Sequence, residues 1–477
     1  MHYMFAKPLT IVVFGATGDL FEKKLAHALF DLFRMKFLSA SVRLVGFSRK
    51  PLTHEEFRVF ARNAIHSKAH GHDEKTLDDF LAKTFYHAGD LSKAKSYEGL
   101  GRFLAELDRK DNLCSDKLFY LAIPPHLYQM VFKRLAASGL AIACAPGVPD
   151  ERAAWTRVLV EKPFGNNLKE ARKLDRLLGK LFAEEQIFRI DHYLAKETIQ
   201  NIISFRFSNG LFESLWDRYH IERVEIKMLE KNAIGTRGKF YEGVGALRDV
   251  GQNHILQMLA LIAMENPKSL APEVIRSARA SVLKKVVFDG EYMRDFVIRG
   301  QYEGYRSEGD VALDSGTETY FKLKAFINNS RWKGVPFILE SGKALSESKT
   351  EIVVYFKPTP CLCPGGHEKG HQNILTFSIS PKESISVRFW AKRPGFEFSL
   401  EPKELSFSVE RDELSHEIPE AYERVLFDCI RGDQTLFTST EEVAAEWKII
   451  MPILDGFKDL QLLSYPVGSA GPLGIWE

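Results

Sequence analysis

The stretch that most limits how this 477-residue chain can fold is a strand-like run that ends in a glycine turn. "LTIVVFG" at 9–15 is almost continuously apolar and rich in β-branched residues, as buried parallel strands are. "GATGDL" at 15–20 follows it, and the apolar residues of 21–33 then recur at helical spacing. Because "VRLVGFSRK" at 42–50 has the character of a second strand, the order predicts a βαβ unit.

The glycine turn has the properties of a site for a dinucleotide phosphate. Gly15 and Gly18 would let the backbone approach a ligand closely, and the next helix would offer free N–H groups. The GxxG spacing departs from the usual GxGxxG fingerprint, so the prediction depends on the turn's place after the first strand. Arg49 and Lys50 end the second strand, where an NAD site normally has an acidic residue. Two cations suit a 2′-phosphate and favour NADP over NAD, and an exposed basic turn is the alternative.

Later segments continue the alternation of strands and helices. Strand signals at 117–125 and 156–165, with a helix signal at 126–139 between them, predict a doubly wound α/β sheet of the Rossmann type. Ligands of such sheets lie at the carboxyl ends of the strands, so Lys162 would face a binding crevice. A solvated surface lysine is the alternative, and only other groups that converge on Lys162 would give it a role.

Acid, imidazole, phenol and ammonium groups gather in "FRIDHYLAKETIQN" at 188–201. Asp191 has the place of an N-cap for a predicted helix, which would put His192 and Lys196 on one face at i and i+4. A phosphate near that face would meet an imidazole, an ammonium and the positive end of the helix dipole. A surface helix with a capping aspartate is the alternative interpretation.

A second polar cluster interrupts a predicted, largely buried helix at 245–265. Asp249 and His254 are its polar members. A buried histidine is usually a satisfied core group, but it can also act as a general base near neutral pH. A base of this kind needs a carboxylate to orient its ring, and Asp191 would serve if the two helices pack together.

The chain changes character after about residue 204. Strand-like segments with hairpin-length connections predict a largely antiparallel sheet. These segments are 223–231, 319–327, 336–342, 350–357, 373–380, 384–392 and 405–410. Segments 421–430 and 441–454 are predicted helices packed over this sheet. We therefore expect a dinucleotide-binding domain at 1–188 and an α+β domain for substrate binding and dimerisation at 189–477.

Composition excludes several classes of partner. The 65 basic and 63 acidic residues nearly balance, which gives no case for nucleic acid or an anionic membrane. Five cysteines and an N-terminus without signal-peptide features fit a reducing compartment and a cytoplasmic protein, not a disulfide framework. No stretch approaches the roughly 18 apolar residues of a membrane span.

One insertion contains residues that could in principle ligate zinc. They are Cys361, Cys363, His367 and His371. Their spacing is tighter than that of usual zinc fingers, so a hairpin loop with incidental polar residues is the favoured interpretation and no metal is expected.

Nine stretches of this sequence, in the same order and near the same spacings, resemble the glucose-6-phosphate dehydrogenase family. They are "GATGDL…KK", "GFSR", "LAIPP", "VEKPFG", "RIDHYLAKE", "GALRDVGQNHILQM", "GQY", "SGKAL" and "AYERVLFDCIRGDQTLF". The resemblance covers about 10–460. It implies an oxidoreductase that oxidises C1 of glucose 6-phosphate to 6-phosphogluconolactone and transfers hydride to NADP⁺, with NAD as a possible secondary cofactor. That reaction is the first step of the oxidative pentose phosphate pathway in carbohydrate metabolism.

The resemblance also implies roles for individual residues. It makes His254 the base for the C1 hydroxyl and Asp191 the carboxylate that pairs with it. It assigns substrate contacts to Lys162, His192, Tyr193, Lys196, Glu230, Asp249 and Lys343. It assigns cofactor contacts to Gly15, Ala16, Thr17, Gly18, Asp19, Leu20, Arg49, Pro124, Pro125, Tyr128 and Lys162. It further implies a homodimer or homotetramer.

Three residues depart from the family's pattern. Ala195 stands where glycine is common, Glu22 follows the pyrophosphate turn, and Ser348 occupies a position where an arginine often contacts the substrate. The last departure puts substrate affinity in doubt, not the type of reaction.

Two other functions stay open at this point. One is a non-catalytic NADP-binding scaffold, against which the intact set of Asp191, His254 and Lys162 argues. The other is a Rossmann oxidoreductase of an unphosphorylated sugar, which would have no use for His192 and Lys196 as a phosphate clamp.

Overall fold

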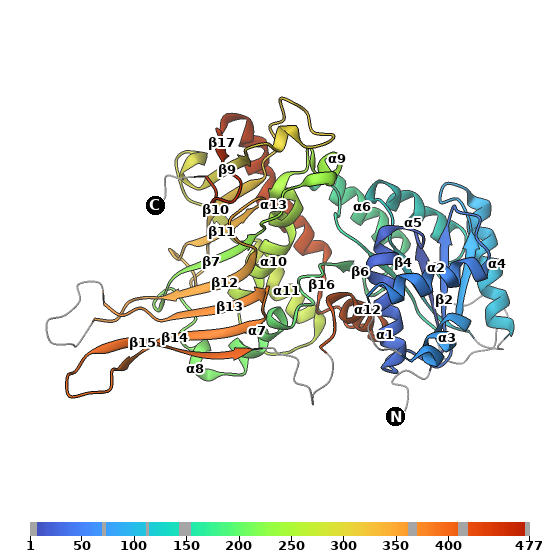
Figure 1. Cartoon of the computed structure of the whole chain (residues 1–477), viewed down its shortest axis with the longest axis horizontal. Helices are drawn as coiled ribbons and strands as arrows, with labels where there is room; N and C mark the ends of the chain where they lie inside the picture. The colour runs from blue at the N-terminus through green and yellow to red at the C-terminus, as the bar shows by residue number, and fades with distance from the viewer. Residues whose placement is uncertain are drawn as a thin grey trace. The chain divides into compact units, whose positions relative to one another are not determined.

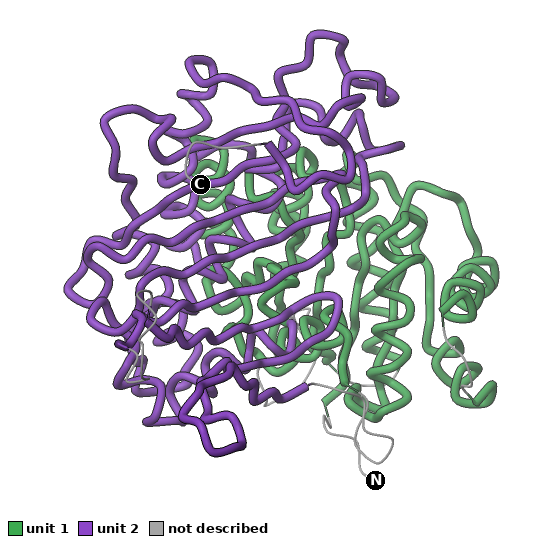
Figure 2. Tube along the Cα trace, turned by 60° about the vertical axis from the view of Figure 1, so that its left-hand side comes forward, with its two compact units in different colours: residues 1–165, 169–195, 418–438 green, residues 166–168, 196–417, 439–477 purple. Residues whose placement is uncertain are grey.

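The computed structural model describes residues 7–68, 73–110, 114–142, 154–360, 370–408 and 418–472. By its internal contacts the chain forms two compact units, coloured separately in Figure 2. The first unit comprises 1–165, 169–195 and 418–438, and the second comprises 166–168, 196–417 and 439–477. The two domains that the sequence predicts, 1–188 and 189–477, remain a proposal.

The first unit is built on a seven-stranded sheet in the order β16-β6-β5-β4-β1-β2-β3 (Figure 1). The strands are β1 (Leu9–Phe14), β2 (Val42–Ser48), β3 (Thr84–Ala88), β4 (Asp116–Leu121), β5 (Thr156–Val160), β6 (Ile187–Ile190) and β16 (Phe437–Thr438). All neighbours pair in parallel except β16 with β6. The predicted doubly wound sheet is therefore confirmed, and β1 and β4 are buried along their whole length, β4 including its charged first residues Asp116 and Lys117.

Helices lie between the parallel strands of this unit along the chain, and one more precedes the antiparallel strand β16. They are η1 (Phe21–Leu25, a π-helix), α1 (Ala26–Arg34), α2 (His54–His66), α3 (Glu74–Ala82), α4 (Ala94–Lys110), α5 (Tyr128–Ala137), α6 (Leu168–Leu181) and α12 (Ala421–Arg431). The predicted strands at 117–125 and 156–165 end earlier, at Leu121 and Val160. Their proline-containing ends are loops, because proline cannot donate a ladder hydrogen bond.

One helix prediction is wrong in its packing. We expected 421–430 to lie over the antiparallel sheet, but α12 belongs to the first unit and packs on α1. The ring of Phe427 lies 5.3 Å from that of Phe37, and β16 then pairs Phe437 with Ile190 at the edge of β6. Helical periodicity shows that one face is apolar, but it does not show which surface that face covers.

The second unit contains a ten-stranded sheet in the order β15-β14-β13-β12-β7-β11-β10-β9-β17, with β8 on β10 (Figure 1). The strands are β7 (Ile221–Leu229), β8 (Val286–Phe288), β9 (Val297–Tyr302), β10 (Tyr320–Ile327), β11 (Phe337–Gly342), β12 (Lys349–Phe356), β13 (Ile374–Ser380), β14 (Ser384–Lys392), β15 (Leu400–Ser408) and β17 (Leu462–Tyr465). β7 with β11 and β17 with β9 are parallel, and the other pairs are antiparallel. The prediction of a mainly antiparallel sheet is confirmed.

Helices complete this unit, and two of them contact the middle of the sheet. They are α7 (Glu197–Phe207), α8 (Gly210–Glu213), α9 (Gly238–Tyr241), η5 (Leu247–Ile255, a π-helix), α10 (Leu256–Ala263), α11 (Pro272–Leu283) and α13 (Thr440–Gly456). The π-helix η5 packs on β7 and β11, and α7 packs on β13. The predicted buried helix at 245–265 is thus a continuous η5–α10 pair on this sheet.

Two expectations about the whole chain can be compared with the structure. No helix among the described residues has both the length and the apolar character needed to cross a bilayer. Cys114 is disulfide-bonded, and buried Cys429 is a free cysteine. The disulfide of Cys114 departs from the expectation of a reducing compartment, where disulfides are rare.

Gly15→Ala should destabilise the first unit more than an ordinary glycine substitution. Gly15 has φ +82°, and a Cβ there would lie 2.2 Å from the carbonyl oxygen of Ala122. We expect the free energy of unfolding to fall by more than about 2 kcal/mol, from left-handed strain plus the clash. Urea unfolding measures the change.

Gly139→Ala is the matched control, because Gly139 has φ +76° but no atom of the described residues lies within 4 Å of the place that a methyl group there would take. Its cost should be about 1 kcal/mol, from the left-handed strain alone. Equal losses in the two variants would show that the approach to Ala122 is unimportant.

Candidate active site

The parallel sheet gathers the predicted cofactor residues at one edge. Phe14 at the end of β1 lies opposite Phe47 of β2 and Leu121 of β4, so these three strands finish together. The glycine turn follows β1, Arg49 follows β2, Pro124 and Pro125 follow β4, and Lys162 follows β5. The strand order reverses between β1 and β4, which is where open α/β sheets bind ligands.

The glycine turn is held to the end of β2. The N–H of Gly15 donates to the carbonyl of Phe47 at 2.9 Å, and the hydroxyls of Thr17 and Ser48 are 2.8 Å apart. The N–H of Gly18 returns to the carbonyl of Gly15 at 2.9 Å, which closes the turn. Arg49 is exposed beyond this junction, so its guanidinium is accessible to a ligand.

The acidic residues near the turn are both exposed. Asp19 forms a 2.8 Å ion pair with Lys23, one helical turn further on. Glu22 lies in the first turn of η1, and its N–H donates to the carbonyl of Gly18 at 3.2 Å. Water therefore solvates the Glu22 carboxylate, which weakens its repulsion of a bound pyrophosphate.

Glu161 is the centre of a hydrogen-bond network that no motif in the sequence indicates. The Glu161 carboxylate accepts a hydrogen bond from the Tyr120 hydroxyl at 2.6 Å and another from Tyr422. Burial raises the pKa of Glu161, and these hydroxyls together with the neighbouring Lys162 oppose the rise. The ring of Tyr422 also stacks on that of His192, with centroids 6.1 Å apart and planes at 14°. Two predicted substrate residues, Lys162 and His192, are thus adjacent to members of one network.

Tyr128 has a different environment from the one that a cofactor contact suggests. Its side chain is buried, and its hydroxyl donates to the backbone carbonyl of Glu161 at 2.9 Å. This bond joins α5 to the loop after β5. The cofactor role of Tyr128 stays a prediction, and the geometry gives its hydroxyl a part in the fold.

The helix predicted to follow an N-cap at Asp191 begins five residues later. Residues 192–195 form a turn, and α7 starts at Glu197 with Lys196 as its N-cap in an extended conformation. Asp191 Oδ1 accepts the N–H of Tyr193 at 3.0 Å, and the Asp191 carbonyl accepts that of Leu194 at 3.1 Å. The prediction of a shared helical face is wrong, because the aspartate bonds its own backbone and stabilises a turn.

The N-terminus of α7 is already paired with an anion of the chain. Glu383, in the turn between β13 and β14, accepts the N–H of Thr198 at 2.8 Å and its hydroxyl at 2.9 Å. A carboxylate at this position satisfies a helix-terminal donor and interacts favourably with the dipole. A phosphate beside Lys196 would therefore depend mainly on side-chain cations.

Three predicted substrate residues converge in the second unit. β7 and β11 pair in parallel with Leu229 opposite Gly342, so Glu230 and Lys343 leave the two strands side by side. The buried Lys343 ammonium contacts the Glu230 carboxylate and lies 3.9 Å from Asp249 Oδ2. A cation between two carboxylates offers hydrogen-bond donors and acceptors to a polyhydroxyl ligand. The roles of these residues remain predictions.

The structure also shows the surroundings of two residues that depart from the family's sequence pattern. The Ser348 hydroxyl accepts the N–H of Lys231 at 2.8 Å, so it holds the segment that follows Glu230. Ala195 is buried, and it is not among the non-glycine residues with positive φ. Alanine therefore fits the turn without left-handed strain.

His254 lies on the π-helical part of its helix. It is 1% exposed, and its backbone N–H donates to Asn253 Oδ1 at 2.7 Å. Because a π-helix repeats at i+5 and winds less per residue than an α-helix, Asp249 and His254 come closer to one face. Asp191 belongs to the first unit and His254 to the second, so their pairing stays a prediction.

The candidate metal loop falls mostly outside the part of the chain that the structure describes. Cys361, Cys363 and His367 are outside the described residues, and the ring of His371 lies 4.2 Å from that of Trp390. Within the described ranges, no three side chains of His, Cys, Asp or Glu are grouped as metal ligands would be.

A Rossmann-type sheet with a glycine turn at its switch point defines a nicotinamide dinucleotide-binding protein. Comparison with family models then gives the family. Residues 12–201 match "Glucose-6-phosphate dehydrogenase, NAD binding domain", and 203–476 match its C-terminal domain.

Individual relatives agree with the family models. Glucose-6-phosphate 1-dehydrogenases of Chlamydia muridarum and Bacillus subtilis are 38% and 36% identical to this chain. The matches cover 98% and 97% of this chain and 95% and 94% of those proteins. An Arabidopsis thaliana enzyme named glucose-6-phosphate 1-dehydrogenase 6, cytoplasmic, is 38% identical over 97% of this chain and 89% of its own length.

Solved structures show the same relationship. A glucose-6-phosphate dehydrogenase in complex with glucose 6-phosphate superposes with a TM-score of 0.90 at 32% identity, covering 100% of this chain and 97% of that one. The Mycobacterium avium enzyme gives 0.81 at 32% identity, with 98% and 96% coverage. The chain belongs to the glucose-6-phosphate dehydrogenase family. The resemblance, the fold class and the class of enzyme predicted from the sequence are confirmed.

Glu318 anchors the N-terminal end of the helix that carries His254. Its buried carboxylate accepts the N–H of Leu247 at 3.0 Å, and a Cβ on Gly245 would lie within 2.5 Å of its oxygens. Gly245 is thus required where the carboxylate approaches the backbone. Burial raises the pKa of Glu318 to about 7, against the opposing hydrogen bond from Leu247 and the charges of Arg248 and Arg299.

Glu318→Gln should change how stability depends on pH. The native state holds the Glu318 proton up to about pH 7, whereas the unfolded chain releases it near the ordinary value of 4.5. The native chain therefore binds more protons in this window, and stability falls as pH rises through it. We expect the wild type to lose roughly 2–3 kcal/mol relative to the variant between pH 5 and 8. Urea unfolding at both pH values tests this, and parallel pH dependences of the two proteins would contradict it.

Proposed function

We propose that this chain is a glucose-6-phosphate 1-dehydrogenase that uses NADP⁺ and carries out the first step of the oxidative pentose phosphate pathway. It oxidises the C1 hydroxyl of glucose 6-phosphate and yields 6-phosphogluconolactone. The observation that carries this proposal is the cluster of Glu230, Asp249 and Lys343 on the helix and strands around His254, in a chain that matches the family along nearly its whole length.

The chemistry requires few groups from the chain itself. His254 takes the proton of the C1 hydroxyl, and Asp191 orients the imidazole and stabilises the imidazolium that forms. Glu230 and Asp249 accept hydrogen bonds from sugar hydroxyls, and Lys343 holds the two carboxylates on either side of its ammonium. Bound NADP⁺ supplies the acceptor for the hydride.

The sugar phosphate binds to cationic and polar groups of the 191–196 turn. His192, Tyr193 and Lys196 are the residues proposed for this contact. Stacking on Tyr422 fixes the plane of the His192 ring. Because Glu383 occupies the α7 terminus, the discrimination for a phosphorylated sugar rests on these side chains.

The cofactor site is proposed at the switch point of the parallel sheet. The turn from Gly15 to Leu20 takes the pyrophosphate, and Arg49 takes the 2′-phosphate that distinguishes NADP from NAD. Lys162 reaches cofactor and substrate, with Pro124, Pro125 and Tyr128 in the segment that leads from β4 into α5. NAD is proposed as a secondary cofactor, since the glycine turn itself does not discriminate.

A cytoplasmic homodimer, or a homotetramer built from it, is the proposed state of the protein. The relatives from Arabidopsis thaliana that are named cytoplasmic support the location. The sheet of the second unit supports the assembly, because exposed Leu405 and Phe407 lie on its edge strand β15.

Glucose 6-phosphate with NADP⁺ should produce reduced nicotinamide, seen as absorbance, at a far higher kcat/KM than glucose does. Loss of charge-assisted contacts to the phosphate is expected to lower kcat/KM by at least about 100-fold for glucose. Equal rates with both sugars would favour the oxidoreductase of an unphosphorylated sugar. Cofactor binding without any turnover would favour the non-catalytic scaffold.

His254→Asn should abolish turnover and leave the affinity for glucose 6-phosphate nearly unchanged. Asparagine retains a polar side chain of similar size but cannot accept the proton, so kcat should fall by at least about 100-fold. Steady-state kinetics and a substrate-binding titration measure the two effects. Retained turnover would remove His254 as the base.

Arg49→Gln should weaken NADP⁺ more than NAD⁺. Loss of the guanidinium removes a charge-assisted contact to the 2′-phosphate, so KM for NADP⁺ should rise by about tenfold or more with little change for NAD⁺. Initial rates with each cofactor at fixed glucose 6-phosphate measure the ratio. Arg109→Gln, at an exposed arginine on α4, is the control and should alter neither KM. An unchanged ratio in Arg49→Gln would move the 2′-phosphate contact elsewhere.

A further inference from the structure

The helix that carries His254 ends in the interior of the second unit. The last four carbonyls of any α-helix lack partners within the helix, and buried ones cannot bond to bulk water. At the end of α10, Leu261, Ile262 and Ala263 are at most 2% exposed. Each of their carbonyls therefore needs a donor from another part of the chain.

Three side chains supply these donors in succession. Arg206 Nη1 donates to the Leu261 carbonyl at 3.1 Å, Trp216 Nε1 to that of Ile262 at 2.8 Å, and Trp332 Nε1 to that of Ala263 at 2.8 Å. The carbonyl of Ala260 accepts the N–H of Met264 at 2.9 Å. All four terminal carbonyls are thus satisfied. We call Arg206, Trp216 and Trp332 the three-donor cap.

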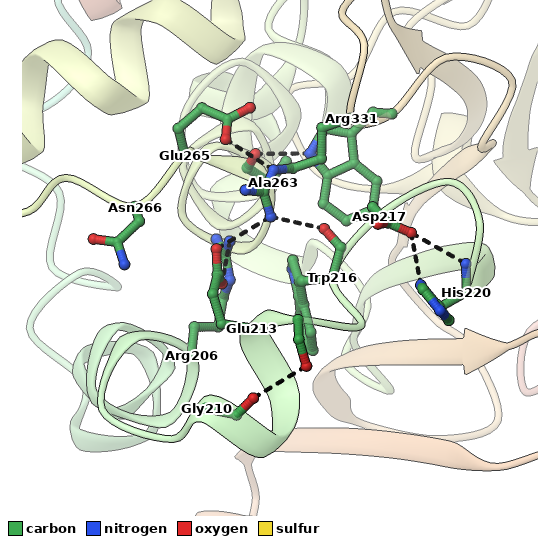
Figure 3. A network of polar contacts seen from close by, with 12 residues as sticks. Arg206, Gly210, Glu213, Trp216, Asp217, His220, Ala263, Glu265, Asn266 and Arg331 are labelled. Atoms are coloured by element: carbon green, nitrogen blue, oxygen red, sulfur yellow. Dashed lines mark hydrogen bonds and ion pairs between the residues drawn. The ribbon is translucent and has the colours of Figure 1, made fainter.

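The charge of the cap is compensated within the same group of residues (Figure 3). Arg206 Nη2 lies 3.2 Å from Glu213 Oε2, and Arg331 Nη1 lies 3.1 Å from the other oxygen of Glu213. Arg331 also donates to the Trp216 carbonyl at 2.9 Å and to Glu265 at 2.8 Å. Burial lowers the pKa of Arg206 to about 10, so the guanidinium stays protonated at neutral pH. A cation at a helix C-terminus also interacts favourably with the dipole.

The members of the cap come from three separate segments. Arg206 is on the last turn of α7, Trp216 follows α8, and Trp332 lies in the loop between β10 and β11. All three side chains are 0% exposed. Because α7 begins directly after Lys196, the same helix has a proposed phosphate contact at one end and the cap at the other.

The rest of the helix is fixed by carboxylates. Glu318 accepts the N–H of Leu247 at the start of η5, and Glu446 on α13 accepts the side-chain N–H groups of Gln252 at 3.1 Å and Gln257 at 2.6 Å. These contacts hold the N-terminal end of the helix and the side that faces α13. His254 stands two residues before the start of α10 on the same continuous helix, so a shift of α10 along its axis would carry His254 with it.

We propose that the three-donor cap positions His254 for proton abstraction by fixing the η5–α10 helix along its axis. This inference rests on the proposed function, in which His254 is the base. Removing one donor leaves a buried carbonyl unsatisfied, and the helix end then shifts toward another partner. A displacement of this kind at the base lowers kcat, because a misplacement of about 1 Å can cost about 100-fold in rate.

Trp332→Phe and Trp216→Phe are the test variants. Each retains an aromatic ring in a buried site and removes the N–H that caps α10. Trp447→Phe is the matched control, because Trp447 on α13 is 1% exposed and its indole N–H has no hydrogen-bond partner among the described residues. The three substitutions therefore delete similar volume, but two of them delete a cap.

We expect kcat with glucose 6-phosphate and NADP⁺ to fall by about tenfold or more in the two test variants. KM for glucose 6-phosphate and the dissociation constant of NADPH, measured by its fluorescence, should change by less than about threefold. Trp447→Phe should keep kcat within about twofold of the wild type. Rates are expressed per folded molecule, with the folded fraction taken from far-ultraviolet circular dichroism, which reports the backbone and not the substituted indoles.

Arg206 gives a second, charge-based test. Arg206→Lys retains a cationic donor and should recover at least part of the kcat that Arg206→Met loses. Arg206→Met also leaves Glu213 with Arg331 as its remaining cationic partner, so this variant can fail to fold. In that case the tryptophan variants test the proposal.

The outcomes separate this inference from the proposed function. An active wild type whose kcat is unchanged in Trp216→Phe and Trp332→Phe, or equally reduced in Trp447→Phe, overturns the positioning role and leaves the proposed function standing. A fall in kcat that is confined to the cap variants, with KM unchanged, supports it. A wild type without turnover on glucose 6-phosphate overturns both.

Discussion

Parallel pairing of neighbouring strands decides where the candidate residues of both units lie. In the first unit, hydrogen bonding of β1 between β2 and β4 makes three strands end at one level, so the glycine turn, Arg49 and the two prolines follow at the same edge. In the second unit, β7 and β11 repeat this arrangement within a mainly antiparallel sheet, and Glu230 and Lys343 emerge together. Without a parallel pair, the two residues would leave their strands at opposite edges.

Side chains that satisfy helix termini then set the positions of the helices. Glu383 pairs with the start of α7, Glu318 with the start of η5, and the three-donor cap with the end of α10. Each of these helices carries a proposed substrate or catalytic residue near the terminus or on the adjoining segment. These buried polar groups therefore help to hold the active site. Removing one of them lowers the free energy of unfolding by more than the hydrogen bond contributes, because its partner is left buried without a hydrogen bond.

Much of the first unit could be predicted from the sequence. A continuous apolar run, a glycine turn and a basic strand end each depend on residues that are neighbours in the chain, so the sequence shows them directly. The family resemblance supplied Glu230, Asp249 and Lys343, and the structure brings them together. Predictions from local patterns failed where a side-chain hydrogen bond competes with helix formation, or where the partner residue is distant in the sequence. Asp191 favours a turn over a helix, and the Glu161 network depends on Tyr422, which is 261 positions away in the sequence. The π-helical winding around His254 has no periodic signature that a nine-residue segment could reveal.

The return of residues 418–438 to the first unit has a consequence for synthesis on the ribosome. β6 is made early, but its outer edge is paired only when β16 has been translated, after the whole stretch from 196 to 417. At about 5–20 residues per second, the edge stays unpaired for roughly 12–50 seconds between the synthesis of β6 and that of β16. Open strand edges invite pairing with other chains. The nascent nucleotide-binding half is therefore most exposed to misassembly before release, and chaperones that shield strand edges would act during this interval.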